Sequence, residues 1–246
     1  MTATDAFSPP TPSGTSTPML EFRDVVKSYG SGATEVRAVT DVNLTFPAGQ
    51  FCAVMGPSGC GKSTLLHLAG ALEAPNAGRV LVDGADVSTM SAVEQAELRR
   101  RHVGYVFQQL NLIPALTAIE NVMLPLELDG VPTKQARARA ADMLRRVDLT
   151  QHIDRYPDDF SGGQRQRIAI ARAVVGDRRL LLAELSRDQG TTVIMVTHEP
   201  RLASWADRTV FIRDGRVVDD SGDITDTDTG IGTDSATDTT TLGSLP

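Results

Sequence analysis

The sequence predicts an α/β fold in which a mainly parallel sheet is accompanied by an antiparallel β subdomain and a helical subdomain. Two long β-type segments, Leu20–Tyr29 and Val36–Phe46, come first, with no helix between them. After residue 50, short apolar runs alternate with helical stretches, which is the pattern of a parallel sheet. Residues 110–165 are mainly helical in character, so we expect the helical subdomain there.

The later strands are short and apolar. We expect strands at Gln50–Met55, Val103–Phe107 and Thr191–Val196, and a hairpin over Arg208–Val218 that turns at Asp214 and Gly215. An Asp-Gly pair between two β-type runs favours a tight hairpin turn.

Four stretches carry helical signals. The expected helices are Lys62–Leu72, a helix from Ser91 to about Arg100, much of 116–155, and Ser161–Val175. Ser91 and Glu94 have the spacing of a capping box. The first helix has its apolar side at Leu65, Leu66 and Leu68, and the third at Ala136, Ala140, Met143, Leu144 and Val147.

Length and composition are those of a globular domain with a sizeable core. The chain has 246 residues, of which 41% are hydrophobic, and it lacks an uninterrupted apolar run of membrane-spanning length. Its start lacks the basic and apolar regions of a secretory signal, so we expect a cytosolic protein. Cys52 and Cys60 do not form a disulfide framework.

The formal charge of −7 is concentrated at the ends of the chain. Residues 219–246 hold seven Asp and no Lys or Arg, and 1–18 hold one more Asp, so 19–218 has a formal charge of +1. A near-neutral folded part argues against nucleic-acid binding. The two polar ends are rich in Ser, Thr, Pro, Asp and Gly, so we expect both to be disordered around one domain at 19–218.

One loop carries the strongest chemical signal. Residues 56–63 read Gly-Pro-Ser-Gly-Cys-Gly-Lys-Ser, which matches G-x-x-x-x-G-K-[ST] between an expected strand and an expected helix. In such a loop backbone N–H groups surround a phosphate, and the helix N-terminus adds its dipole. Lys62 would neutralise the β- and γ-phosphates, and Ser63 would bind Mg²⁺. The motif predicts a P-loop NTPase core; the alternative is an ordinary glycine-rich turn.

Three further segments extend this motif. Residues 160–164 read Phe-Ser-Gly-Gly-Gln and are followed by Arg-Gln-Arg, while Gln108 and His198 each follow an expected strand. Together these features make 19–218 similar to the ATP-binding subunit of an ABC transporter. The resemblance implies ATP and Mg²⁺ as cofactors and a head-to-tail dimer with a second ATP-binding subunit. It also implies a separate membrane permease, which would hold the cytoplasmic subunit at the inner face of the cell membrane.

The resemblance assigns roles to single residues. The segment at 161–164 would cap the γ-phosphate of ATP held by the second subunit, again through a helix N-terminus. Gln108 would contact Mg²⁺, and Tyr29 would contact the adenine ring. His198 would be the catalytic residue and contact the γ-phosphate. The implied nucleotide contacts are Tyr29, Gly56, Pro57, Ser58, Gly59, Cys60, Gly61, Lys62, Ser63, Thr64, Gln108, Ser161, Gly162, Gly163 and Gln164.

Several of these residues also have structural alternatives. A lone Tyr29 is as often core packing, Gln108 a solvated side chain, and His198 a structural residue at a strand end. The segment at 161–164 is, by itself, equally a loop and helix cap. For the basic run at 99–102 we favour cations at a helix C-terminus over a nucleic-acid patch.

A finer resemblance rests on two stretches. Residues 105–114 read Tyr-Val-Phe-Gln-Gln-Leu-Asn-Leu-Ile-Pro, and 120–128 read Glu-Asn-Val-Met-Leu-Pro-Leu-Glu-Leu. Both are similar to the macrolide-export, lipoprotein-release and cell-division subgroup. In that subgroup the subunits pair with membrane proteins that carry large extracytoplasmic domains.

The chain departs from the family pattern in one place. Family members follow the strand near 180–183 with Asp-Glu, a loop that signals across the dimer, and a helix. Roughly twenty such residues are absent between Ala183 and Glu184. The Asp would orient the Mg²⁺ water shell, and the Glu would polarise the attacking water. Glu184 falls near the Asp position but is followed by Leu185, so neither it nor Asp188 is assigned a catalytic role.

The shortening leaves two alternatives for Leu180–Leu185. Only seven residues lie between Ala183 and Thr191, whereas parallel neighbours usually need a crossover of about a dozen. Seven extended residues reach at most ~25 Å, enough to run back along one strand. In the second alternative this Leu-rich segment becomes the missing helix, and the sheet loses a strand.

Three functional hypotheses follow. The chain is a hydrolysing subunit that drives a permease, an ATP-binding regulatory or partner subunit that hydrolyses little, or a non-functional copy produced by an in-frame deletion. We expect strongly impaired turnover, because phosphoryl transfer depends on the positioning that the absent carboxylates supply.

Overall fold

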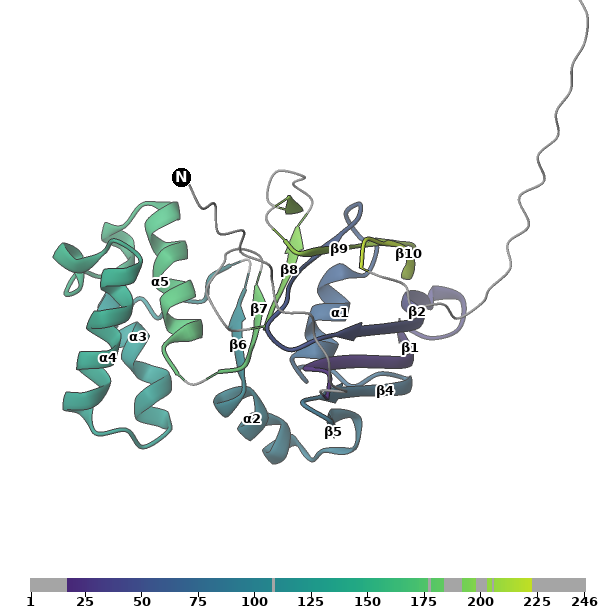
Figure 1. The fold of residues 1–246 in the computed structure, drawn as a ribbon, viewed down its shortest axis with the longest axis horizontal. Helices are drawn as coiled ribbons and strands as arrows, with labels where there is room; N and C mark the ends of the chain where they lie inside the picture. The colour runs from purple at the N-terminus through teal and green to yellow at the C-terminus, as the bar shows by residue number, and fades with distance from the viewer. Residues whose placement is uncertain are drawn as a thin grey trace, which may run out of the picture.

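A computed structural model shows a six-stranded sheet in the middle of the molecule, between a four-stranded sheet and a helical unit (Figure 1). The structure describes residues 17–107, 109–176, 178–183, 192–197, 203–204 and 206–222. The helical unit consists of α3 (Ala118–Leu128), α4 (Thr133–Arg146) and α5 (Gly162–Val174). This architecture confirms the predicted α/β class with its antiparallel β and helical parts.

The four-stranded sheet is antiparallel and contains the two long N-terminal strands at their predicted bounds. Its strands, in spatial order, are β2 (Val36–Phe46), β1 (Leu20–Tyr29), β4 (Ala77–Val82) and β5 (Ala85–Asp86). Leu20 pairs with Phe46, and Tyr29 pairs with Val36. Short 3₁₀ helices occur at Gly32–Thr34, Val87–Thr89, Thr150–His152 and Pro157–Asp159.

The six-stranded sheet is parallel except at one edge. Its strands, in spatial order, are β10 (Arg216–Asp220), β9 (Arg208–Arg213), β3 (Phe51–Met55), β8 (Thr192–Thr197), β7 (Leu180–Ala183) and β6 (Val103–Val106). β3, β7 and β8 are buried along their whole length, as parallel strands covered on both faces must be.

The predicted end of the last hairpin at residue 218 is two residues too early. β10 continues to Asp220, which pairs with Val210 and accepts a 2.7 Å hydrogen bond from Nε of Arg208. The pairing of the strand therefore includes two of the aspartates that the sequence assigned to the acidic tail. Residues 223–246 of that tail, and residues 1–16, lie outside the described residues.

Residues 180–183 form a strand, so the helix alternative is wrong. Leu180 pairs with Val103 of β6 on one side and with Thr192 of β8 on the other. A segment with all four side chains buried and two parallel partners gains ladder hydrogen bonds on both edges, which outweighs the helix propensity of leucine. The connection to β8, residues 184–191, lies outside the described residues.

α1 (Lys62–Ala69) buries Leu65, Leu66 and Leu68 as predicted but ends before the predicted Leu72. Its C-cap is Gly70, and Ala71 follows with φ 49°, a left-handed conformation that stops the helix. The Leu72 N–H then donates to the His67 carbonyl over 2.9 Å, which closes the last turn.

α2 (Ala92–Arg101) begins with the predicted capping box, in which Ser91 and Glu94 bond to each other's backbone N–H groups. Its three arginines occupy the last turn, as in the interpretation that we favoured. Arg99 donates to the Ala71 carbonyl, and Arg100 donates to the Leu128 carbonyl over 2.9 Å and to Asp129 over 2.8 Å. These contacts tie α2 to the ends of α1 and α3.

The helical unit has its own apolar core, and one polar side chain is buried beside it. Ala136, Ala140 and Leu144 of α4 are buried as predicted, with Met143 and Val147 partly buried against them. Asn121 is fully buried and makes four hydrogen bonds. Its amide group donates to the carbonyls of Ile113, Leu116 and Thr117 over 3.0 to 3.1 Å, and its Oδ1 accepts from the Ile113 N–H over 2.8 Å.

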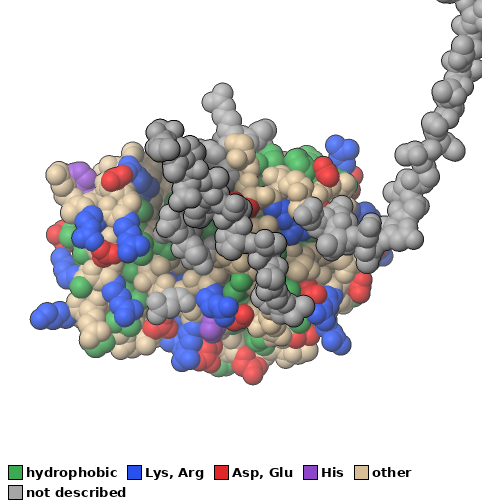
Figure 2. Space-filling model, in the orientation of Figure 1, with side chains coloured by type: hydrophobic (Ala, Val, Ile, Leu, Met, Phe, Trp, Pro, Cys, Tyr) green, Lys and Arg blue, Asp and Glu red, His purple; other side chains and the backbone are tan. Residues whose placement is uncertain are grey.

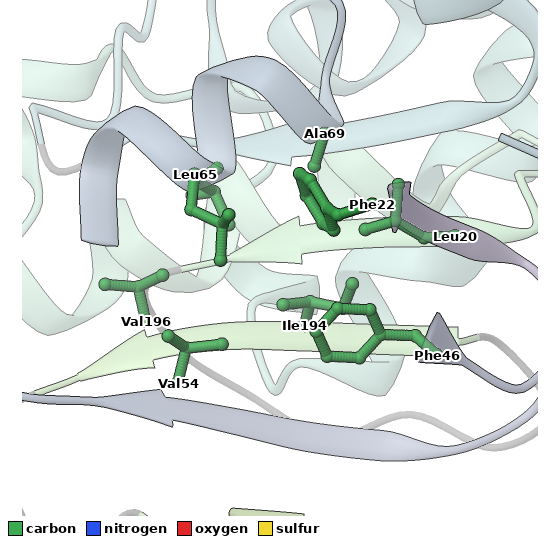
Figure 3. A pocket seen from close by; sticks show the side chains of 9 residues that line it. Leu20, Phe22, Phe46, Val54, Leu65, Ala69, Ile194 and Val196 are labelled. Atoms are coloured by element: carbon green, nitrogen blue, oxygen red, sulfur yellow. The ribbon is translucent and has the colours of Figure 1, made fainter. Parts of the chain in front are cut away.

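A small apolar cavity lies where α1 meets both sheets (Figure 3). Leu65 and Ala69 of α1 point into it from one side, and Val54, Ile194 and Val196 of the parallel sheet from the other. The rings of Phe22 and Phe46 meet edge to face, with their centroids 6.3 Å apart. The cavity's lining provides no polar partner that could hold a water molecule.

Basic and acidic side chains are interspersed over the face shown in Figure 2. On α4, for example, Asp142 accepts from Arg146 over 3.1 Å and also pairs with Arg145. Exposed pairs of this kind contribute little to stability. No helix within the described part of the chain is long and apolar enough to cross a membrane.

Replacing Asn121 with Ala is expected to lower the free energy of unfolding by about 2–4 kcal/mol, because the Ile113 N–H loses its acceptor and the Leu116 carbonyl its side-chain donor in a buried site. The Ile113 and Thr117 carbonyls keep backbone donors. Urea denaturation at neutral pH measures this loss. Asn43→Ala is the matched control, since exposed Asn43 bonds to Asp24 where water replaces it. Equal losses in the two variants would contradict the expectation.

Candidate functional site

The loop at 56–61 connects the buried end of β3 to the first turn of α1. Gly61 is the N-cap of α1 in a left-handed conformation, with φ 102°, and no side chain caps the helix. The N–H groups of the first helical turn therefore lack a capping side chain, which is the arrangement that binds anions at a helix start. Pro57, Ser58 and Gly59 are exposed, whereas Cys60 is buried.

Two glycines of this loop lie against neighbouring backbone. A Cβ on Gly56 would lie 2.1 Å from the Ile212 carbonyl oxygen, and one on Gly61 would lie 2.0 Å from the Ala38 carbonyl oxygen. No side chain fits at such distances. Gly59 has φ 79° and open space around it, so its constraint is conformational.

The Lys62 side chain folds back over the loop. Its ammonium donates to the Gly56 carbonyl over 2.8 Å and to the Pro57 carbonyl over 2.7 Å, with Cys60 Sγ at 3.7 Å. Ser63 is exposed on the same first turn, and Thr64 is half-buried beside it. A cation, a hydroxyl and an uncapped helix start thus converge at the loop, which suits a polyphosphate with a metal ion.

Tyr29 lies beside the same turn of α1. The residue is 41% exposed, so it is not core packing. Its hydroxyl donates to Glu73 Oε2 over 2.7 Å and lies 3.4 Å from Thr64 Oγ1. The Lys27 ammonium is 5.3 Å from the centre of the ring. The structure therefore brings Tyr29 close to the first turn of α1, at Thr64, and its predicted contact with adenine stays a prediction.

Glu73 contacts Tyr29, and the sequence analysis did not identify it as a candidate site residue. Besides the Tyr29 hydroxyl, it lies 3.3 Å from the Lys27 ammonium and 3.1 Å from His67 Nδ1. Burial raises the pKa of this carboxyl, but hydrogen bonds from Tyr29, His67 and Lys27 outweigh burial and lower its pKa overall. Burial raises the pKa of the Tyr29 phenol, with Glu73 adding to the effect. No local motif marks position 73, because its partners come from two other elements, β1 with Lys27 and Tyr29 and α1 with His67.

The segment at 161–164 begins α5 with a capping box. Ser161 Oγ accepts from the Gln164 N–H over 3.3 Å, and Gln164 Oε1 accepts from the Ser161 N–H over 2.9 Å. Gly162 and Gly163 are exposed with open space around them. Their N–H groups belong to the first turn, where a helix supplies no carbonyl partner, and an anion at this helix start would be stabilised.

The parallel sheet separates α5 from α1. Val54 and Ile194 face the cluster that contains α1, whereas Ala53 and Met195 face the cluster that contains Ala169 and Ala173 of α5. The two helices thus cover opposite faces of the sheet. The structure does not bring the segment at 161–164 to the phosphate loop of the same chain.

Arg172 is a second residue that the sequence did not indicate. It extends from α5 and donates to the carbonyls of Leu110 and Asn111, each over 2.6 Å. Both of these residues have positive φ, 57° and 45°. Burial lowers the pKa of the Arg172 guanidinium, and the nearby Arg178 lowers it further. The contact fixes the chain just after position 108 to the helix that begins at the 161–164 segment.

Gln108 and His198 lie outside the described residues, so their predicted roles stay predictions. The strands that lead to them are described. Met55 pairs with Thr197, Ala183 with Met195, and Val106 with Ala183. The carboxyl ends of β3, β8, β7 and β6 therefore lie along one edge of the sheet, where open α/β sheets bind their ligands.

Comparison with known protein families identifies the family that has this loop and segment. Residues 39–184 match the family described as ABC transporter, and this stretch contains both the loop at 56–63 and the segment at 160–164. This chain belongs to the ABC transporter family. The assignment confirms the expected resemblance.

Individual relatives of this ABC chain fall into two kinds. It is 43% identical over 227 residues to the uncharacterized ABC transporter ATP-binding protein YvrO of Bacillus subtilis (strain 168), covering 84% of this chain and 99% of YvrO. It is 41% identical over 222 residues to the lipoprotein-releasing system ATP-binding protein LolD of Geobacter metallireducens. That match covers 82% of this chain and 99% of LolD. A macrolide export ATP-binding/permease protein MacB of Brucella abortus is 43% identical, but the chain spans only 34% of its length.

Solved ABC cassettes share the fold. The dimeric post-hydrolysis structure of the ATP-binding cassette MJ0796, bound to ADP and Pi, superposes with a TM-score of 0.77 at 34% identity. The match covers 82% of this chain and 97% of that cassette. The relatives also confirm the predicted similarity to macrolide-export and lipoprotein-release proteins.

Replacing Glu73 with Gln is expected to destabilise the protein at pH 7 and to matter much less at pH 3. A carboxyl whose pKa is lowered by folding stabilises the folded state above its unfolded pKa of about 4.3, and this contribution is lost as the pH falls through the folded pKa. Urea denaturation of both proteins at the two pH values measures the difference. In a Tyr29→Phe background Glu73 lacks one hydrogen-bond donor, so the difference in unfolding free energy caused by Glu73→Gln at pH 7 should be smaller. A difference in unfolding free energy that is the same at both pH values would contradict the expectation.

Proposed function

We propose that this ABC chain binds ATP and Mg²⁺ at the loop of residues 56–63 and acts, together with a second ATP-binding subunit, on a separate membrane permease. The observation that carries the proposal is the start of α1, an uncapped helix N-terminus approached by glycines that have no room for a side chain. Lys62 supplies the cation over the same loop. This combination is specific for the phosphates of a nucleotide.

The residues around the loop take distinct roles in this proposal. Lys62 neutralises the β- and γ-phosphates, and the Ser63 hydroxyl is a ligand of Mg²⁺, with Gln108 as a further ligand. The exposed ring of Tyr29 stacks on adenine, and His198 contacts the γ-phosphate. Bound Mg²⁺ would neutralise the charge that develops on the transferred phosphoryl group.

The positions of α1 and α5 support a dimer. The segment at 161–164 places the N–H groups of two exposed glycines at a helix start, but α5 lies across the sheet from the loop of its own chain. In a head-to-tail pair these groups would cap the nucleotide of the other subunit. The related cassette MJ0796 is dimeric in its ADP-bound and Pi-bound structure.

The lengths of the relatives support a separate permease. YvrO and LolD are matched over 99% of their own length, and both are named as ATP-binding proteins. MacB is named as an ATP-binding/permease protein, and about two thirds of its length has no counterpart in the matched region. We therefore place this chain at the inner face of the membrane, held there by a permease on another chain.

A second function, ATP binding with little hydrolysis, is favoured by the alignment lengths. The YvrO alignment is 227 residues long, whereas 84% of this 246-residue chain is only about 207. The LolD alignment is 222 residues long, whereas 82% of the chain is about 202. About twenty positions in each relative thus face no residue of this chain. This supports the proposed absence of the Asp-Glu pair after Ala183.

Excess Mg·ATP is expected to raise the thermal midpoint of the wild-type protein, because ATP at about 100 times its Kd stabilises a binding-competent fold by ~2.7 kcal/mol. Lys62→Ala should lose most of the shift, while Lys134→Ala, which removes an exposed lysine from α4, should keep it. Differential scanning calorimetry with and without Mg·ATP measures the effect. A broad wild-type transition that ignores ATP would refute the proposed nucleotide site.

ATP turnover by the purified chain is expected to fall well below 1 s⁻¹, since the carboxylates that position water and the metal shell are absent. Phosphate release in the presence of Mg²⁺ measures it. Inserting the unmatched YvrO segment between Ala183 and Glu184 should raise turnover, and adding Lys62→Ala to the chimera should abolish it. Mg²⁺-dependent turnover near 1 s⁻¹ in the unmodified chain, abolished by Lys62→Ala, would refute the impairment.

A further inference from the structure

The turn between β9 and β10 lies directly behind the phosphate loop. Its two residues are Asp214, with φ 50°, and Gly215, with φ 75°. The Gly215 N–H donates to the Cys60 carbonyl over 3.1 Å, and the Gly215 carbonyl accepts from the Thr40 N–H over 2.8 Å. Gly215 thus connects the loop to β2 through its backbone.

The space around this contact is closed by backbone atoms. A Cβ on Gly215 would lie 2.8 Å from the Ala38 carbonyl oxygen and 3.2 Å from Val39 Cα. The same Ala38 carbonyl limits Gly61, whose Cβ position is 3.6 Å from Gly215 Cα. Gly61 and Gly215 therefore pack against one carbonyl, with no side chain between them.

The geometry points to Gly215 as a positioning residue for nucleotide binding, which acts by holding Cys60 and Gly61 in place. A side chain at 215 must displace β2 or the loop, because its nearest neighbours are backbone atoms. Either movement reorients the N–H groups at the start of α1. In enzymes, a misplacement of about 1 Å can lower the reaction rate as much as 100-fold, and we expect the affinity for ATP to depend on the position of these N–H groups in the same way. The inference rests on the proposed ATP site.

The chain contains a matched turn that lacks this contact. Asp83 and Gly84 join β4 to β5 with φ values of 49° and 80°, almost the same as those of Asp214 and Gly215. A Cβ on Gly84 would meet only the Thr17 side chain, at 3.1 Å. β5 is the edge strand farthest from β2 in its sheet. Substitutions at the two glycines thus impose the same backbone strain in different surroundings.

The test compares Gly215→Ala with Gly84→Ala in the full chain, by calorimetric titration with Mg·ATP and by thermal melts without nucleotide. We expect the Kd for ATP to rise at least tenfold in Gly215→Ala and less than twofold in Gly84→Ala. The nucleotide-free melting temperature should fall in both variants, and further in Gly215→Ala, because only there must backbone atoms move. The titrations are therefore made below both melting temperatures, so that folded proteins are compared. Gly215→Asn and Gly84→Asn repeat the comparison with a residue that better tolerates positive φ.

Equal ATP affinities in the two variants of a pair would overturn the inference, whether both match the wild type or both are weakened. A Gly215→Asn protein that does not fold, beside a folded Gly84→Asn protein, would assign the turn to folding and overturn it as well. If the wild type itself binds no ATP and equals Lys62→Ala, the proposed nucleotide site fails first. Those results are distinguishable, because the wild-type titration is made in the same series.

Discussion

The burial of β3 between β8 and β9 is the constraint on which the rest of the structure depends. Cys52, Ala53 and Val54 are fully buried, and the strand pairs in parallel on both sides. Its end at Met55 delivers the chain to Gly56 directly against the Ile212 carbonyl, where a Cβ cannot fit. The shape of the phosphate loop is therefore set by the sheet, through backbone packing that tolerates no side chain.

The same sheet divides the candidate site into two halves. Alternating residues of β3 and β8 face α1 on one side and α5 on the other. The two outward-facing helix starts of one chain consequently lie on different faces. A site that uses both helix starts requires two chains, which gives the proposed dimer its physical basis.

The proposed shortening after Ala183 does not remove β7 from the sheet. β7 keeps both neighbours and all four buried side chains. The sheet edge that presents the loop is thus built from described strands, and the proposed loss of the Asp-Glu pair after Ala183 leaves these strands in place. Nucleotide binding at the loop requires only the sheet and the first turn of α1, whereas hydrolysis would also require carboxylates that position the metal and the attacking water.

The sequence alone determined the features whose causes are local. The capping boxes at Ser91 and Ser161, the Asp-Gly hairpin at 214 and the glycine loop at 56–63 each depend on residues a few positions apart. Only the tertiary structure decided that Leu180–Ala183 is a strand, because two distant partners outweigh local helix propensity. It also placed Glu73 beside Tyr29, Arg172 on Leu110 and Gly215 behind Cys60. These contacts join residues far apart in the chain through hydrogen bonds and backbone packing, and no local pattern of residue types encodes such pairs.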